Sequence, residues 1–181
     1  SRERLELAAW LGHEPSRAAL DLPLEDEDLL PADREFATGI QSLLEAHDEL
    51  KRATGLRILL ALARQAAQTA HETAQPLLSE LVTLAAKQVV AGEDLVGRMR
   101  ELRVGDQIRQ TFESGSPTWR CFAVCFMVSQ VVAGERPNYA WGAANHARLL
   151  LAEGERGGSA LSVARAEVVP WLLGLQDPLQ P

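Results

Sequence analysis

Aromatic and β-branched residues are sparse in this chain. Phe, Trp and Tyr make up only 5% of its 181 residues, and no stretch alternates apolar and polar residues for long enough to predict a β-strand. Alanine and leucine are abundant instead, and this balance favours helix over sheet. The hydrophobic fraction of 46% suffices for one core, and a chain of this length usually forms one domain. The sequence therefore predicts an all-α fold, with residues 1–181 as a single helical domain.

The chain also lacks a concentrated basic region and an apolar run of membrane length. Its formal net charge is −7, whereas nucleic-acid binding requires a concentrated basic face. No polybasic run is present that would attract an anionic membrane surface. The most apolar stretch, residues 119–133, has about 15 residues and is shorter than the roughly 20 that cross a bilayer. We therefore expect neither nucleic acid nor a membrane as a partner.

Only two cysteines are present, Cys121 and Cys125. Their spacing of four places both on the same face of one helix, where a disulfide bridge would be strained. We interpret them as reduced core thiols in preference to a metal or redox pair. The start of the sequence shows no basic and apolar regions of a secretory signal. Together these features predict a protein of the reducing cytoplasm.

Motifs for catalysis and metal binding are missing as well. None of the four histidines belongs to a His-Glu-x-x-His or Glu-x-x-His pair, and Cys-x-x-Cys does not occur. The glycines and serines of the predicted loops lack the lysine of a phosphate loop and the flanking residues of a nucleophile elbow. We therefore predict no catalytic residue, no metal ligand and no cofactor. A metal site assembled from separate helices stays open, and an enzyme is a weaker expectation than a binding protein.

The most organised stretch runs from Trp119 to Ala133 and is apolar on nearly every side. Pro117 lies just inside a helix start that Ser116 would cap. A helix that is apolar all round is normally buried. We predict that residues 117–133 form a central helix, with about eight antiparallel helices packed in a layered array. A loose spacing of helix pairs, about 35–45 residues, also leaves an α-solenoid open.

Three segments interrupt the helical pattern or limit it. Residues 21–31 are predicted to form an exposed acidic linker, and residues 153–160 a mobile loop with three glycines. We expect residues 177–181 to fray at the end of the chain. Residues 95–112 are predicted to form one polar surface helix. Two glycines, Gly97 and Gly105, weaken its continuity.

The richest candidate for a binding surface lies near the C-terminus, on a helix predicted at residues 139–152. Trp141, Asn145 and Arg148 are spaced by four and three residues, so they share one helical face. Tryptophan and arginine dominate the hot spots of protein interfaces. In the alternative interpretation, which is the more ordinary one, Trp141 packs in the core while Asn145 and His146 bond to backbone groups.

The acidic linker supplies the second candidate binding segment. Its carboxylates would either recognise a basic partner or simply be solvated. The predicted binding residues of the chain are accordingly Trp141, Asn145, Arg148, Glu25, Asp26, Glu27 and Asp28.

Several stretches resemble known helical proteins. The opening Arg-Glu-Arg-Leu-Glu-Leu-Ala-Ala-Trp-Leu-Gly-His-Glu-Pro-Ser-Arg-Ala-Ala-Leu, Arg34-Glu-Phe-Ala-Thr-Gly-Ile, and Leu60-Ala-Leu-Ala-Arg resemble a group of small Ala/Leu-rich helical bacterial proteins. The later helices resemble those of all-helical immunity proteins, in which an Ala-rich helix with a histidine, here Ala140 to Ala147, lies near the C-terminus. The resemblance implies a cytoplasmic protein that binds another protein, and an acidic surface would suit a basic toxin. It transfers no catalytic residue.

These observations leave three hypotheses of function. The first is a helical protein–protein interaction module, immunity-like or regulatory, that binds another protein of basic character. The second is a helical bundle that binds a small molecule or a metal, with enzymatic activity open, whose pocket is lined by Trp119, Phe122, Phe126 and Trp141 together with His146. The third is a homodimer formed through an exposed side of the apolar helix.

Overall fold

The computed structural model describes residues 1–22, 33–111, 115–152 and 159–180. Within these ranges the chain is helical and contains no strand, which confirms the predicted all-α class. The helices are α1 (Arg2–Trp10), α2 (Glu14–Ala19), α3 (Asp33–Glu45), α4 (Glu49–Thr69), α5 (Gln75–Ala91), α6 (Val96–Glu101), α7 (Val104–Thr111), α8 (Pro117–Val132), α9 (Tyr139–Ala152) and α10 (Ala160–Leu172). The predicted acidic binding residues Glu25, Asp26, Glu27 and Asp28 lie outside the described residues, as does most of the predicted loop at 153–160.

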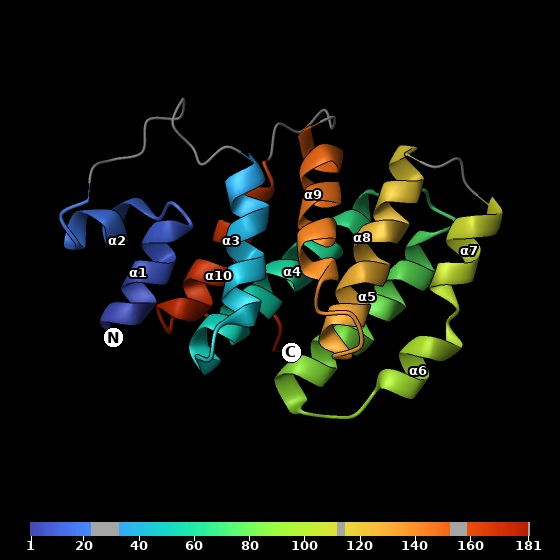
Figure 1. Cartoon of the computed structure of the whole chain (residues 1–181), viewed down its shortest axis with the longest axis horizontal. Helices are drawn as coiled ribbons and strands as arrows, with labels where there is room; N and C mark the ends of the chain where they lie inside the picture. The colour runs from blue at the N-terminus through green and yellow to red at the C-terminus, as the bar shows by residue number, and fades with distance from the viewer. Residues whose placement is uncertain (23–32, 112–114, 153–158, 181) are drawn as a thin grey trace.

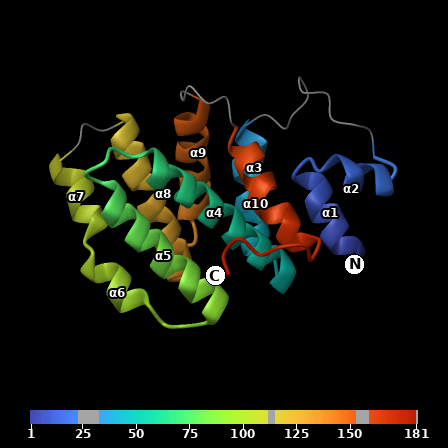
Figure 2. The same cartoon turned by 180° about the vertical axis from the view of Figure 1, so that it is seen from behind.

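The longer helices form two layers, as the views from the two sides show (Figures 1 and 2). Helices α3, α9 and α8 lie side by side in one layer, and α10, α4 and α5 lie in the other. The short helices α1 and α2 flank one end of this array, and α6 and α7 flank the opposite end. The predicted layered array is therefore present.

Two helices lie at the centre of the core. The predicted helix at 117–133 is α8, and its apolar side chains pack against α4, α5, α7 and α9. Its start is as predicted, because the Ser116 side chain accepts a hydrogen bond from the N–H of Trp119. Helix α4 lies equally near the centre, since it packs against α3, α5, α8, α9 and α10. The sequence thus indicates one of the two central helices.

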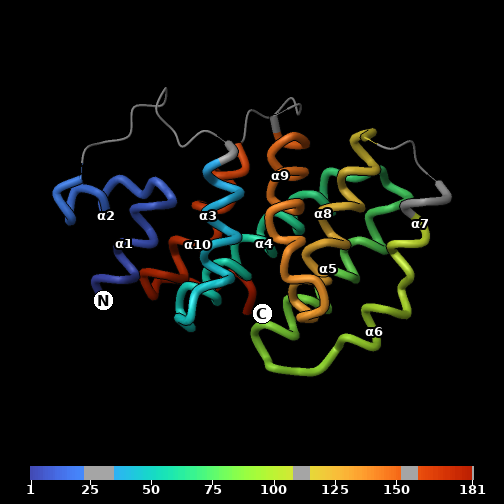
Figure 3. The backbone as a smooth tube through the Cα atoms, viewed as in Figure 1, coloured from blue at the N-terminus to red at the C-terminus, as the bar shows by residue number. Residues whose placement is uncertain are grey.

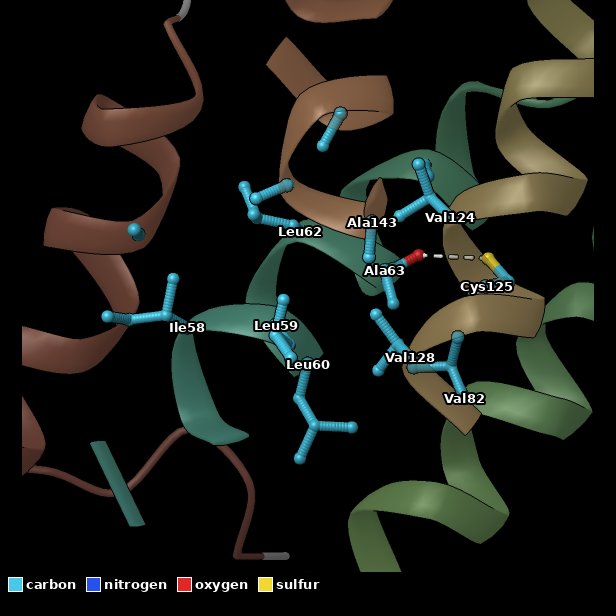
Figure 4. Close-up of a cluster of buried hydrophobic side chains, with 14 of the residues drawn as sticks. Ile58, Leu59, Leu60, Leu62, Ala63, Val82, Val124, Cys125, Val128 and Ala143 are labelled. Atoms are coloured by element: carbon cyan, nitrogen blue, oxygen red, sulfur yellow. Dashed lines mark hydrogen bonds between the residues drawn. The ribbon is translucent and has the colours of Figure 1, made fainter. Parts of the chain in front are cut away.

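The contact between α4 and α8 is formed by buried apolar side chains (Figure 4). Leu59, Leu60 and Ala63 of α4 are buried on the side that faces Val128 of α8, whereas Ile58 is buried on the side of α4 towards α10. The Cys125 thiol donates a hydrogen bond to the Ala63 carbonyl over 3.4 Å. This bond satisfies the one polar hydrogen that the thiol brings into the core.

Both cysteines are free and buried. Burial raises the pKa of the Cys121 thiol to about 11 and that of the Cys125 thiol still further. The thiols are therefore protonated near neutral pH and unreactive, in agreement with the prediction that they are reduced core residues.

The predicted surface helix at 95–112 is two helices in the structure. The chain turns at Arg103, whose φ is 51°, so α6 ends before it and α7 begins after it. A positive φ is costly for a residue with a Cβ. The sequence does not predict this conformation at Arg103, because the nearby glycines, which adopt a positive φ easily, are inside the helices: Gly97 in α6 and Gly105 in α7.

Helix α1 is bound to the rest of the fold by packing at two places. The ring of Trp10 lies so close to Gly39 of α3 that a Cβ at Gly39 would clash with it, and it stacks on Phe36 with ring centroids 6.0 Å apart. On the other side, Arg4 Nη1 donates to the Leu172 carbonyl of α10 over 3.2 Å. The tube in Figure 3 shows these two ends of the chain side by side.

The segment after α10 returns along α4 and is held there. Arg57 Nη1 and Nη2 donate to the two carboxylate oxygens of Asp177 over 2.6 and 3.0 Å. Arg64 Nη2 donates to the Pro178 carbonyl over 3.5 Å, and Leu179 packs against the core. The prediction that this end frays is therefore wrong for residues 177–180, which we call the C-terminal strap.

Candidate functional site

The three predicted binding residues of the ninth helix share one side of α9, at its edge towards α3. Trp141 is 40% exposed, and its backbone N–H donates to Gln41 Oε1 of α3 over 3.2 Å. Arg148 Nη2 donates to Asn145 Oδ1 over 3.0 Å, so the amide orients the guanidinium. We call Gln41, Trp141, Asn145 and Arg148 the α9 face. Its role in binding stays a prediction.

The local sequence explains why Trp141 points outward. Ala140, Ala143, Ala144 and Ala147 are at most 1% exposed, and their small side chains let α9 lie close against α3, α4 and α8. Trp141 follows a buried alanine by one residue, and consecutive residues on a helix are about 100° apart. The indole is therefore turned away from the core, and the interpretation that Trp141 packs inside is wrong.

A second group of side chains joins α8 and α9 on the opposite flank of α9. Arg120 Nη1 donates to His146 Nδ1 over 3.1 Å, and because a guanidinium only donates, the neutral imidazole carries its proton on Nε2. The ring of Trp119 meets the imidazole edge-on, with centroids 5.2 Å apart. Burial and the neighbouring Arg120 charge lower the pKa of His146. The histidine is therefore neutral near pH 7 and bonds to a side chain instead of the expected backbone group.

The pocket that the second hypothesis requires does not assemble. Trp119 and His146 do meet, but Phe122 is 1% exposed and belongs to the core. Phe126 lies against Gly105 of α7 and lines a different cavity. Trp141 lies at the outer surface. The sequence identifies these side chains as large, but the three on α8 and the two on α9 do not all face the same neighbours.

Among the cavities in the described part of the chain, two lie beside α5 and join segments far apart in the sequence. One, of about 360 Å³, lies between α5, α6, α7 and α8, and its lining includes Phe126 and the ion pair of Arg100 with Glu135. The other, of about 610 Å³, lies between α4, α5 and the C-terminal strap. No spacing pattern in the sequence indicated either cavity, because each is built from segments far apart in the chain.

The residues that hold the C-terminal strap were also not predicted. Arg57 lies over the ring of Trp171, with its Cζ 4.2 Å from the ring centroid, and Arg4 lies 5.5 Å from the same ring. Burial opposes ionisation of Asp177, but hydrogen bonds from Arg57 and from the N–H of Leu179 hold its pKa below the usual value. A carboxylate close to the end of a chain carries no signal for such a pairing.

The described residues contain no group of three or more His, Cys, Asp or Glu side chains placed to hold a metal ion. None of the described helices combines the length and the apolar character that a membrane span requires.

Comparison of this chain with protein-family models, with curated proteins and with solved structures gives no match. Its function therefore has to be inferred from its own residues.

Proposed function

We propose that this protein is a helical protein–protein interaction module that binds its partner through the α9 face. The observation that carries the proposal is the exposure of Trp141 on a rigid helix. A tryptophan buries about 150–250 Å² when covered, and exposed tryptophans beside an oriented arginine are the typical hot spots of interfaces. Trp141 and Arg148 would be the two main contacts.

The side chains around Trp141 are held in place before any partner binds. Gln41 bonds to the start of α9, and Asn145 orients Arg148, so two contacts within the protein hold the face in place. Side chains that are ordered before binding lose less conformational entropy when the partner arrives. The α9 face would therefore bind without rearrangement.

The overall charge supports a partner of basic character. A net charge of −7 would accelerate encounter with a positively charged protein and would make the association rate fall with added salt. The finer form of the proposal is an immunity-like or regulatory role in the cytoplasm, a location with which two buried free thiols are consistent.

The experiment is site-specific photo-crosslinking in lysate of the source organism. A photoreactive amino acid replaces Asn138, an exposed residue three positions before Trp141, or Thr83, an exposed residue of α5 in the other layer. We expect one protein to be crosslinked from position 138 and not from position 83. Trp141→Ala should remove that product, because it deletes the central contact of the interface.

Leu175→Ala is the matched control, because Leu175 is a large apolar side chain that is 78% exposed outside the α9 face. It should leave the crosslink unchanged. An equal product from position 83, or a product that survives Trp141→Ala, contradicts the proposal. A crosslinked product of twice the chain mass would instead identify a second copy of the chain as the partner.

A further inference from the structure

The cavity between α4, α5 and the C-terminal strap has the construction of a small-molecule site. Its volume of about 610 Å³ falls within the range of roughly 300–1,000 Å³ that is typical of ligand pockets. Figure 2 shows the three segments side by side on the face seen from behind. Its lining consists of Arg64, Ala67, Gln68, Ser79, Val82, Thr83, Ala86, Lys87, Val90, Ala91, Glu93, Pro178, Leu179 and Gln180.

One side of this cavity is an apolar strip that follows α5. Val82, Ala86 and Val90 are spaced by four residues, so they lie along one side of the helix. Ala67 of α4 and Leu179 of the strap line the same cavity. Ala86, Val90 and Leu179 remain partly exposed, so solvent contacts apolar surface that a hydrocarbon chain would cover.

The charges around this strip are mostly positive, in contrast with the rest of the protein. Arg64 and Lys87 line the cavity, and Glu93 is the one acidic residue among the lining residues, whereas the whole chain carries −7. Arg64 is partly occupied by Glu167 at 3.4 Å and by the Pro178 carbonyl at 3.5 Å. Both contacts are long, and a guanidinium has five N–H donors, so Arg64 can also donate hydrogen bonds to the carboxylate of a ligand.

We propose that this cavity binds a small amphipathic carboxylate, with its alkyl chain along the strip of Val82, Ala86 and Val90 and its head group at Arg64 and Lys87. The strap is part of the site, because Leu179 lines it. Arg57 and Asp177 lie outside the cavity and act as positioning residues, since their ion pair holds Leu179 in place.

The experiment measures binding of decanoate by isothermal titration calorimetry, with decyltrimethylammonium as a probe of equal chain length and opposite charge. We expect decanoate to bind with saturable heat and the cation to bind at least tenfold more weakly, because only the carboxylate is attracted by Arg64 and Lys87. Binding of both probes with equal affinity would overturn the charge assignment.

Two pairs of matched variants locate the site. Ala86→Phe fills the apolar strip and should abolish decanoate binding, whereas Ala18→Phe, on the exposed side of α2, should leave it unchanged. Lys87→Glu should weaken binding about fivefold or more, and Lys51→Glu should not. Lys51 and Lys87 are the two lysines of the chain, and both are exposed.

Thr83→Phe, on the exposed rim of the same cavity, provides a second blocking variant if Ala86→Phe does not fold, as judged by circular dichroism. The proposal is overturned if decanoate gives no heat at millimolar concentration, or if a folded variant blocked at position 83 or 86 binds decanoate as the unmodified protein does. Asp177→Asn should weaken decanoate binding, because it loosens the strap that carries Leu179. It should not change the preference for decanoate over decyltrimethylammonium, because Arg64 and Lys87 stay in place.

Discussion

Trp171 and Trp141 both lie on helices that carry or contact arginine side chains, and the two tryptophans differ in how the groups around them are satisfied. Around Trp171, Arg57 and Arg4 lie over the ring, and Arg57 also pairs with both carboxylate oxygens of Asp177. Around Trp141, the described part of the chain places no cation or second aromatic ring against the indole, which is 40% exposed. The first group is complete within the protein, whereas the second leaves its largest apolar surface to solvent.

The difference shows what the same residue types do in two settings. At Trp171 they join α1, α4, α10 and the C-terminal strap, so their role is structural. At Trp141 the neighbouring groups of Gln41 and Arg148 are fixed by hydrogen bonds, but the indole itself is not enclosed. Substitutions at the first place should therefore change stability, and substitutions at the second should change binding.

The largest effect is expected from Trp171→Ala. Removing this half-buried ring of α10 deletes its contacts with Arg57 of α4 and Arg4 of α1, whose guanidinium groups lie over it. We expect a loss of about 2–3 kcal/mol in the free energy of unfolding, measured by urea denaturation. Trp171→Phe is the control, and it should recover part of the loss because an aromatic face remains. Equal loss in both variants would contradict the stacking role of the ring.

Asp177→Asn should have the next largest effect. The Arg57 and Asp177 side chains are 11% and 21% exposed, so loss of one partner leaves a poorly solvated guanidinium without its carboxylate. We expect about 1–2 kcal/mol of destabilisation and faster proteolysis of the C-terminal strap. Glu6→Gln is the matched control, because it breaks the exposed Arg2–Glu6 pair and should change stability little.

The same substitution should remove part of the acid sensitivity. Hydrogen bonds to Asp177 keep its pKa lower in the folded protein than in the unfolded chain, so the pair stabilises the fold above the unfolded pKa. This stabilisation is lost as the pH falls through the folded pKa. The unmodified protein should therefore lose more stability than Asp177→Asn between pH 5 and pH 3.

His146→Gln should have a smaller effect, visible as a change in pH dependence. Burial and Arg120 lower the pKa of the folded-state imidazole, so the unfolded chain binds more protons below the unfolded value near 6.5. Stability should fall as the pH drops from 7.5 towards 5, and the fall should be shallower in His146→Gln. Other groups titrate in both proteins, so the difference between the two unfolding curves isolates His146. Parallel curves would contradict this assignment.

The smallest effect on stability is expected from Trp141→Ala. Its ring is partly exposed, and we expect less than about 0.5–1 kcal/mol, by the same denaturation measurement. Binding to a partner should nevertheless be reduced severely, as the crosslinking experiment tests. A stability loss as large as that of Trp171→Ala would mean that the indole is structural and would remove the distinction between the two tryptophans.

Local patterns predicted the helices well because their causes are local. The apolar run after Ser116 and Pro117 indicates both the start and the burial of α8, and the spacing of Trp141, Asn145 and Arg148 places them on one face. Two features depend on contacts that local patterns do not contain. Arg57 and Asp177 are 120 residues apart, so the strap could not be inferred. The turn at Arg103 separates α6, which packs against α5, from α7, which packs against α8.

The candidate site was predictable only in part for the same reason. The period of the helix identified which residues share the α9 face, but the alanines beside Trp141 decide its exposure. A tryptophan on an amphipathic helix can be either buried or exposed. Here Ala140 and Ala144 are on the buried side of α9, which packs against α3 and α8, so Trp141 is exposed. The lining of the cavity beside the strap depends on three segments that meet only in the folded protein.

The contact between α1 and α10 has a consequence for how this chain folds during synthesis. Arg4 and Leu172, which it joins, are 168 residues apart. A ribosome adds about 5–20 residues per second, so on the order of ten to thirty seconds separate the emergence of the two helices. During this interval α1 has no α10 to pack against, although it was made first. The side of α1 that faces α10 is therefore covered late, whereas Trp10 can pack against Phe36 and Gly39 of α3 soon after α3 is made.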